Sequence, residues 1–348
     1  MIILFAVLLF SFLIFIHELG HFLAAKASGV RVNEFALFMG PAIFKKQVGD
    51  TLYSIRCIPI GGYCAMEGED EDTDSPGSFQ KAAWWKRLCI LLAGAAMNFV
   101  AGVLLLAIVF APVKQVIVPV IDQKEAGCTI VREDGLHLGD RFVEINGEKI
   151  YTSSDFSMLL SLKSGDYHDI VVERDGKRVS FDNYFMERHE FADGIRYGFS
   201  FGTESLDFGG KIAYIWNNSL NVVRSVRLSL QMIFTGRAGL SDMAGPVGIV
   251  SMMSDTAANS ETPLAAFLNI LYFGGFIAIN LAVMNLLPIP ALDGGRAVCL
   301  LLTTAYEKLT KKKLNPKYEG YLHGAGMILL LGIMAVIMFK DVFMLFKG

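Results

Sequence analysis

Apolar side chains are concentrated in four long stretches of the chain. These are Met1–Ile16, Leu88–Ala111, Ala265–Leu292 and Gly320–Phe339, and none contains Asp, Glu, Lys or Arg. A helix of about 20 apolar residues crosses the hydrocarbon core of a bilayer. The pattern therefore predicts four transmembrane helices. Buried helices of a soluble protein are the alternative, but four of this length in one soluble chain would be unusual.

Basic side chains flank these stretches unevenly, and this predicts an orientation. They cluster between the first and second stretches and between the third and fourth: Lys26, Arg31, Lys45, Lys46, Arg56, Lys81, Lys86 and Arg87, then Arg296, Lys308, Lys311, Lys312, Lys313 and Lys317. Cytoplasmic loops carry an excess of Lys and Arg. We therefore expect both loops in the cytoplasm, and both termini and the long segment between the second and third stretches outside it.

Residues 28–87 show the two-residue period of strands. Thr51–Ile58 alternates between apolar and polar side chains, and Gly61, Gly62 and Tyr63 follow as a turn. Such alternation beside glycines is typical of a β-strand that ends in a turn. We expect a β-rich segment that lies against the membrane on the cytoplasmic side.

The segment at 113–207 is predicted to be a separate β domain. Residues 138–150 and 170–179 each have the pattern of a strand, an Asn-Gly or Asp-Gly turn and a second strand. The first hairpin resembles the Gly-Asp…Ile-Asn-Gly signature of PDZ domains, which implies one PDZ-like domain. From residue 208, apolar positions recur at three- and four-residue steps, as in an amphipathic helix at the membrane interface or one packed on the β domain.

The predicted fold is a mainly α membrane protein with one inserted PDZ-like β-rich domain and a membrane-associated β segment. In order, we expect transmembrane helix 1 at 1–27, the cytoplasmic β segment at 28–87, transmembrane helix 2 at 88–112, the extracytoplasmic PDZ-like domain at 113–207, an amphipathic helix and connecting segment at 208–264, transmembrane segment 3 at 265–295, a cytoplasmic loop at 296–319 and transmembrane helix 4 at 320–343.

Composition agrees with a membrane protein and excludes other classes. Hydrophobic residues make up 53% of the chain and charged residues 19%, whereas globular proteins carry roughly 25% charged residues. The net charge of −3 argues against a nucleic-acid partner, which would need a basic face. The five cysteines include no CxxC pair, so neither a disulfide framework nor a thiolate metal site is predicted.

An HExxH motif, His17-Glu18-Leu19-Gly20-His21, directly follows the first apolar stretch. On a helix both imidazoles face one side and can share a metal ion, and Glu18 can contact a water molecule beside that ion. Zinc takes such ligands. Ionisable groups inside a membrane are costly and normally functional. A bound metal ion explains them, and a proton relay in a transporter is the alternative.

A third protein ligand must come from another part of the chain. Asp293 directly follows the third apolar stretch, in which Pro288 and Pro290 prevent a regular helix. Broken backbone at membrane depth is tolerated where it lines a cavity or is buried in protein. The predicted topology places Asp293 on the same side as the HExxH motif. His323 and Glu319, at the start of the fourth stretch, are weaker candidates.

Together these motifs resemble the site-2 protease family of intramembrane zinc metalloproteases, most closely its bacterial RseP type. The resemblance extends over nearly the whole chain. It rests on five motifs in order: HExxH, Gly61-Gly62-Tyr63, Gly94-Ala95-Ala96-Met97-Asn98, Gly245-Pro246 and the Asn-x-x-Pro-x-Pro-x-Leu-Asp-Gly run at 285–294. Two differences stand out, because RseP has two tandem PDZ domains and the family usually has Gly-Pro where this chain has Gly94-Ala95.

The resemblance implies a hydrolase of the bacterial cell membrane that holds one Zn²⁺ per chain. His17, His21 and Asp293 would bind the zinc, and Glu18 would be catalytic. The implied substrate-binding residues are Asn285, Pro288, Pro290, Asn98, Gly61 and Gly62.

The implied substrates are single-span membrane proteins, such as anti-sigma factors or signal-peptide remnants, cut within the lipid bilayer in regulated intramembrane proteolysis. The PDZ-like domain would screen substrates or contact peptides. A transporter that uses the same ionisable side chains and an inactive scaffold are the alternatives.

Overall fold

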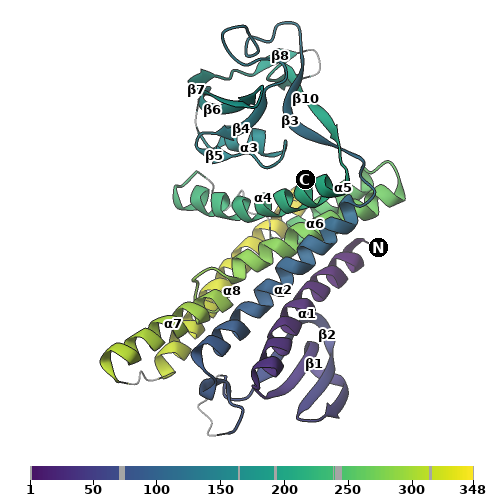
Figure 1. Ribbon diagram of the computed structural model, residues 1–348. Helices are drawn as coiled ribbons and strands as arrows, with labels where there is room; N and C mark the ends of the chain where they lie inside the picture. Colours follow the sequence, from purple (N-terminus) through teal and green to yellow (C-terminus); the bar gives the residue numbers. More distant parts are fainter. Residues whose placement is uncertain are drawn as a thin grey trace. The chain divides into compact units, whose positions relative to one another are not determined.

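The structure is a computed structural model that describes residues 2–69, 75–163, 165–191, 194–237, 239, 245–312 and 316–347. The chain folds as two compact units (Figure 1). The first comprises Met1–Leu106 and Ser229–Gly348, and the second comprises Ala107–Leu228.

Among the described residues, four helices are long and apolar enough to cross a membrane. They are α1 (Ile2–Ser28), α2 (Trp84–Phe110), α6 (Pro263–Asn285) and α8 (Pro316–Lys347). Large apolar side chains such as Leu104 and Leu329 are exposed on their outer faces, as expected of surfaces that contact lipid. The prediction of a mainly helical protein with four membrane helices is confirmed at this level.

Two further helices belong to the first unit, and the sequence did not predict them. Residues within the connecting segment form α5 (Pro246–Ala258), whose first residue is a proline. Proline suits a helix start because the N–H that it lacks would have no partner there. Much of the predicted loop at 296–319 instead belongs to α7 (Asp293–Thr310). Ala297 and Leu300 are buried, so one face of this helix packs against the rest of the protein.

The segment between α1 and α2 contains a β-sheet, as its alternation predicted. Strand β1 (Val32–Val48) is followed by β2 (Thr51–Met66) and a short 3₁₀ helix, η1 (Phe79–Lys81). Residues 34–37 of β1 pair with residues 62–65 on one side and with residues 52–55 on the other. Within the described chain, the end of β2 is therefore an open edge of the sheet.

The sheet packs on the last turns of α1. The rings of Phe22 and Phe35 lie 4.9 Å apart, and those of Phe15 and Phe35 lie 5.8 Å apart. Ala25, Val32 and Phe35 belong to one buried apolar cluster. This packing holds the sheet beside the helical turns that carry the HExxH motif.

The second unit is built on a twisted sheet with the strand order β10-β3-β4-β6-β7, in which β5 also pairs with β4. The strands are β3 (Gln115–Lys124), β4 (Arg141–Ile145), β5 (Glu148–Lys149), β6 (Tyr167–Arg174), β7 (Lys177–Phe185) and β10 (Phe199–Ser205), with a separate pair, β8 (His189–Phe191) and β9 (Gly194–Arg196). Helix α3 (Asp155–Ser161) packs on this sheet through Phe156, which is buried against Phe142.

Both predicted hairpin turns are present in this unit. Asn146 and Gly147 have φ angles of 51° and 80°, and Asp175 and Gly176 have φ angles of 50° and 73°. Positive φ at both central residues is the type I′ geometry that fits the twist of a two-residue hairpin.

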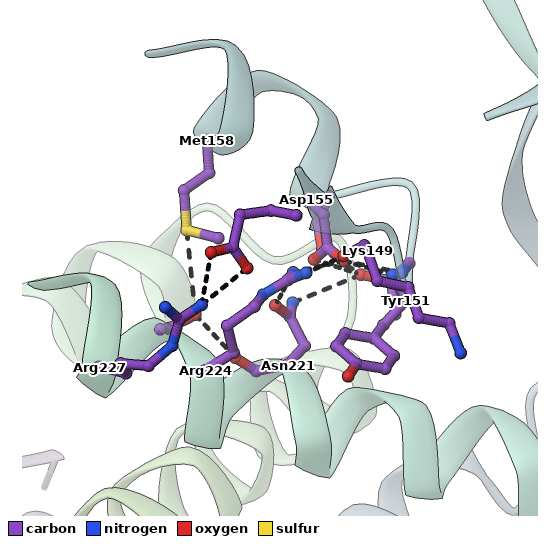
Figure 2. Close-up of polar contacts among 11 residues, drawn as sticks. Lys149, Tyr151, Asp155, Met158, Asn221, Arg224 and Arg227 are labelled. Carbon is purple, nitrogen blue, oxygen red and sulfur yellow. Dashed lines mark hydrogen bonds and ion pairs between the residues drawn. The ribbon is translucent and has the colours of Figure 1, made fainter. Parts of the chain in front are cut away.

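Helix α4 (Phe208–Phe234) follows β10, and its residues up to Leu228 belong to the same unit. One face of this helix is tied to the β domain by ion pairs (Figure 2). Arg224 lies 2.7 Å from Asp155 and also donates to the carbonyl of Lys149, while Arg227 lies 2.7 Å from Glu148. The sequence left two roles open for this helix, and these contacts correspond to packing on the β domain.

Candidate metal centre

Three side chains from two distant parts of the first unit converge on one point. Nε2 of His17 and Nε2 of His21 are 3.1 Å apart. Oδ2 of Asp293 lies 3.1 Å from the first nitrogen and 3.3 Å from the second. Within the described ranges, no other group of three or more His, Cys, Asp or Glu side chains brings its ligand atoms so close together.

A hydrogen bond to α2 fixes which nitrogen of His21 faces this point. Its Nδ1 lies 2.9 Å from the carbonyl oxygen of Ile90. A carbonyl oxygen can only accept, so Nδ1 carries the proton of the neutral ring. Nε2 then carries a lone pair that points toward His17 and Asp293. A metal ligand requires this tautomer of the ring.

The three donors fit a zinc ion. Zinc binds nitrogen and oxygen at about 2.0–2.1 Å in tetrahedral sites, which separates ligand atoms by about 3.3 Å. The separations of 3.1–3.3 Å agree with that spacing. Oδ2 of Asp293 is also shut off from solvent and accepts no hydrogen bond from the described residues. A buried carboxylate oxygen beside two imidazole nitrogens has the surroundings of a cation ligand.

Broken backbone between two helices places Asp293 in this cluster. Helix α6 ends at Asn285 and α7 begins at Asp293. Just before α7, Ala291 has a φ of 78°, and its N–H donates to Nδ1 of His323 at 3.0 Å. The sequence offered His323 as a possible third ligand, but the structure places this ring against the backbone that precedes Asp293.

Close helix packing also shapes the site, and it depends on glycine. A Cβ added to Gly94 of α2 would lie 2.7 Å from Cε1 of His17 and 2.8 Å from Cε1 of His21. A Cβ on Gly20, inside the HExxH motif, would lie 2.8 Å from the carbonyl carbon of Ala93. Only residues without a side chain let α1 and α2 approach this closely.

The chain matches peptidase family M50 over residues 5–333. It belongs to that family.

Several relatives of this M50 protein are alike over their whole length. A protein named as a candidate zinc metalloprotease of Clostridium perfringens is 34% identical over 98% of both chains. A similarly named protein of Clostridium acetobutylicum is 35% identical over 97% of this chain and 96% of its own. The zinc metalloprotease RasP of Shouchella clausii is 28% identical over 97% and 98% of the two chains. The predicted membership of the site-2 protease family is confirmed.

Other predicted site residues of this M50 protein lie around the three ligands. Nδ2 of Asn98 is 3.5 Å from Nδ1 of His17, and Nδ2 of Asn285 is 3.4 Å from the same nitrogen. A Cβ on Gly62 would lie 3.7 Å from Cγ of Glu18, so the open edge of β2 passes beside this carboxylate side chain.

The remaining predicted residues shape the backbone around the site. Gly61 has a φ of 81° and lies against Met39. A Cβ on Gly326 of α8 would lie 2.5 Å from Cβ of Pro290, so α8 supports the loop between α6 and α7. Pro288, in the same loop, is exposed.

Sequence reasoning missed the supporting roles of Gly20, Gly94, His323 and Gly326. Glycines and a histidine in otherwise apolar helices were the available signals. Those signals do not say which residue, far away in the sequence, each of them contacts.

Ionisable side chains of the β segment brace its sheet. Glu34 accepts hydrogen bonds from Ser54 at 2.6 Å and Arg56 at 2.7 Å. Burial and the hydrogen bond to Glu34 raise the pKa of Tyr63 to about 12. Burial, and then the charge of Glu18, raise the pKa of Cys64 to about 12. Both groups stay protonated at neutral pH, so neither carries a negative charge there.

Proposed function

We propose that His17, His21 and Asp293 hold the zinc ion of an intramembrane metalloprotease and that Glu18 is its catalytic residue. The observation that carries this proposal is the convergence of three ligand atoms at 3.1–3.3 Å within the first unit. The chain belongs to a peptidase family, and its relatives are named zinc metalloproteases. It is therefore a zinc metalloprotease of the bacterial membrane, and the proposal assigns residues to that activity.

Bound by these side chains, zinc would supply Lewis acidity to the scissile carbonyl group and to water. Glu18 follows His17 on α1, about 100° further round the helix, so its carboxylate lies beside the ligands without being one of them. Glu18 takes the proton of the attacking water and delivers it to the nitrogen of the leaving amine. The peptide bond is broken by hydrolysis, with one water consumed.

The substrate has to unwind before it can be cut. A peptide bond in a transmembrane helix is shielded by the hydrogen bonds of that helix. The open edge of β2 offers unpaired backbone groups with which an extended segment can pair. Gly62 brings this edge beside Glu18 without a side chain in the way. Asn285 would hold the substrate backbone, and the loop with Pro288 and Pro290 would line its path.

Substrates and topology follow from the same proposal. The substrates would be single-span membrane proteins, such as anti-sigma factors or signal-peptide remnants. The active site would face the cytoplasm, since the basic loops flank it on that side. The β domain at 113–207 would be a PDZ-like domain outside the cytoplasm that screens substrates by size or contacts their peptides.

Metal analysis together with a cleavage assay tests the assignment. Purified wild-type protein should contain one zinc ion per chain and cut members of a panel of single-span substrates. Glu18→Gln should keep the zinc and lose cleavage, because it removes the base but no ligand. Asp293→Asn should lose both, because it removes the carboxylate ligand. Normal cleavage by Glu18→Gln would disprove the role of Glu18, and ion-driven flux by zinc-free protein would favour a transporter.

A further inference from the structure

His17 faces two carboxamides with a nitrogen that requires an acceptor. Its Nε2 points to His21 and Asp293, so a metal ligand at this position carries its proton on Nδ1. Two side-chain amides lie within hydrogen-bonding distance of this nitrogen in the described structure, that of Asn98 at 3.5 Å and that of Asn285 at 3.4 Å. Both amides present their NH₂ group to His17, so two donors would face the Nδ1–H donor.

A half-turn of one amide gives this N–H an acceptor. The oxygen and nitrogen of a carboxamide occupy nearly the same envelope, and their assignment follows from the hydrogen-bond network. Asn98 is 1% exposed, and its Oδ1 is buried without a hydrogen bond from any described residue. Turned through 180°, this oxygen accepts from Nδ1–H of His17, and both groups gain a partner. Asn285 has no such orphaned oxygen and is only half-buried.

We propose that Asn98 is the positioning residue of His17: its Oδ1 accepts a hydrogen bond from Nδ1–H and stabilises the tautomer that presents Nε2 to zinc. Asn285 then remains free to bind the substrate. This inference rests on the proposed zinc site and gives Asn98 a different role from the substrate contact implied by the family resemblance.

The geometry of α2 supports this assignment. Ile90, Gly94 and Asn98 follow one another at four-residue steps, so they lie on one face of the helix. The carbonyl of Ile90 orients His21, and Gly94 allows the close approach of both rings. Asn98 completes this face by orienting His17. One helix would thus supply the acceptors for both imidazole ligands.

Zinc retention distinguishes this role from a contact with substrate. The partners of metal-ligating histidines typically contribute 10–100-fold in metal affinity. In full-length protein purified in detergent, Asn98→Leu removes the acceptor at similar size. We expect its zinc affinity, measured by competition with a chelator, to fall about 10–100-fold, and its cobalt-substituted form to show an altered absorption spectrum. Asn98→Asp keeps an acceptor and should retain zinc like the wild type.

Two other asparagines serve as comparisons. Asn285→Leu should hold zinc normally and lose cleavage, since Asn285 acts on the substrate. Asn280→Leu is the matched control, because Asn280 lies on α6 and, among the residues that the structure describes, donates only to its own helix, to the carbonyl of Phe276 at 2.9 Å. That variant should match the wild type in zinc affinity and in the cobalt spectrum. If Asn98→Leu does not fold, Asn98→Ala removes the acceptor without adding bulk and provides the same measurements.

The outcomes separate this inference from the proposed function. Wild-type zinc affinity and an unchanged cobalt spectrum in Asn98→Leu or Asn98→Ala would overturn the positioning role. The positioning role would also be overturned if Asn98→Asp lost zinc as fully as Asn98→Leu, because the acceptor would then be irrelevant. Wild-type protein that binds no zinc would instead overturn the proposed function.

Discussion

The substitution Gly94→Ala should weaken zinc binding strongly, although Gly94 is neither a proposed ligand nor the proposed catalytic residue. A methyl group at this position would lie 2.7 Å from Cε1 of His17 and 2.8 Å from Cε1 of His21, and closer still to Nε2 of His21. Ordinary van der Waals contact begins at 3.4 Å. Both rings would therefore have to move by about 0.7 Å or more, or α1 and α2 would have to separate by a similar distance.

Zinc coordination does not tolerate such a shift. Metal–ligand distances in functional sites stay within about 0.2 Å of their ideal values. A displacement of about 0.7 Å thus removes at least one of three protein ligands. Loss of an outer-shell partner alone costs roughly 10–100-fold in affinity. Loss of a ligand should cost more, so we expect a decrease in zinc affinity of at least about 100-fold, or about 2.7 kcal/mol.

Chelator competition on purified protein measures this effect. The control is Gly332→Ala on α8, where an added methyl group would meet no heavy atom within 4 Å. This variant should bind zinc and cleave substrate like the wild type. Helix content by circular dichroism shows whether Gly94→Ala is folded. A folded Gly94→Ala protein with wild-type zinc affinity would refute the reasoning, since it would mean that α2 does not constrain the two imidazoles.

Three further predictions concern the β domain and the β segment. Arg224→Met would leave the fully buried carboxylate of Asp155 without its cation and should cost about 3–5 kcal/mol in the stability of the β domain. The loss should appear as faster amide hydrogen exchange in α3, and unchanged exchange would contradict this prediction. Burial, and then the charge of Lys163, lower the pKa of His168 below its ordinary 6.5. The stability that the neutral ring contributes is therefore complete above pH 6.5 and is lost as the pH falls through the lowered pKa. Hydrogen exchange in β6, corrected for intrinsic rates, should show this loss in the wild type and not in His168→Gln. Finally, Cys64, with a pKa of about 12, should react with a maleimide at pH 8 far more slowly than the exposed Cys57, and equal rates would disprove its burial.

Local patterns predicted those features of the fold that depend on neighbouring residues. The lengths of the apolar stretches predicted the membrane helices, because a helix rises by a constant amount per residue. The Asn146-Gly147 pair predicted a hairpin turn, because few other residues adopt positive φ readily. The prediction missed α5, because a helix of 13 residues offers few turns over which a period can be recognised. It missed the helical part of the 296–319 segment because the basic residues there indicated a cytoplasmic loop.

The sequence by itself determined the chemistry that is available to this protein. Four-residue spacing on a helix is a local property, so the HExxH motif alone brings two imidazoles to one side with a carboxylate beside them. The family resemblance then indicated which distant carboxylate to expect.

Only the tertiary structure decided which distant groups meet these imidazoles. Asp293 reaches them because the helical backbone is interrupted after α6, and His323 accepts a hydrogen bond from Ala291 in that interruption. Gly94 lets α2 approach. The amide of Asn285 lies beside His17 although 268 positions separate them in the chain. Such contacts depend on how whole helices pack against one another, and no local period in the sequence encodes that packing.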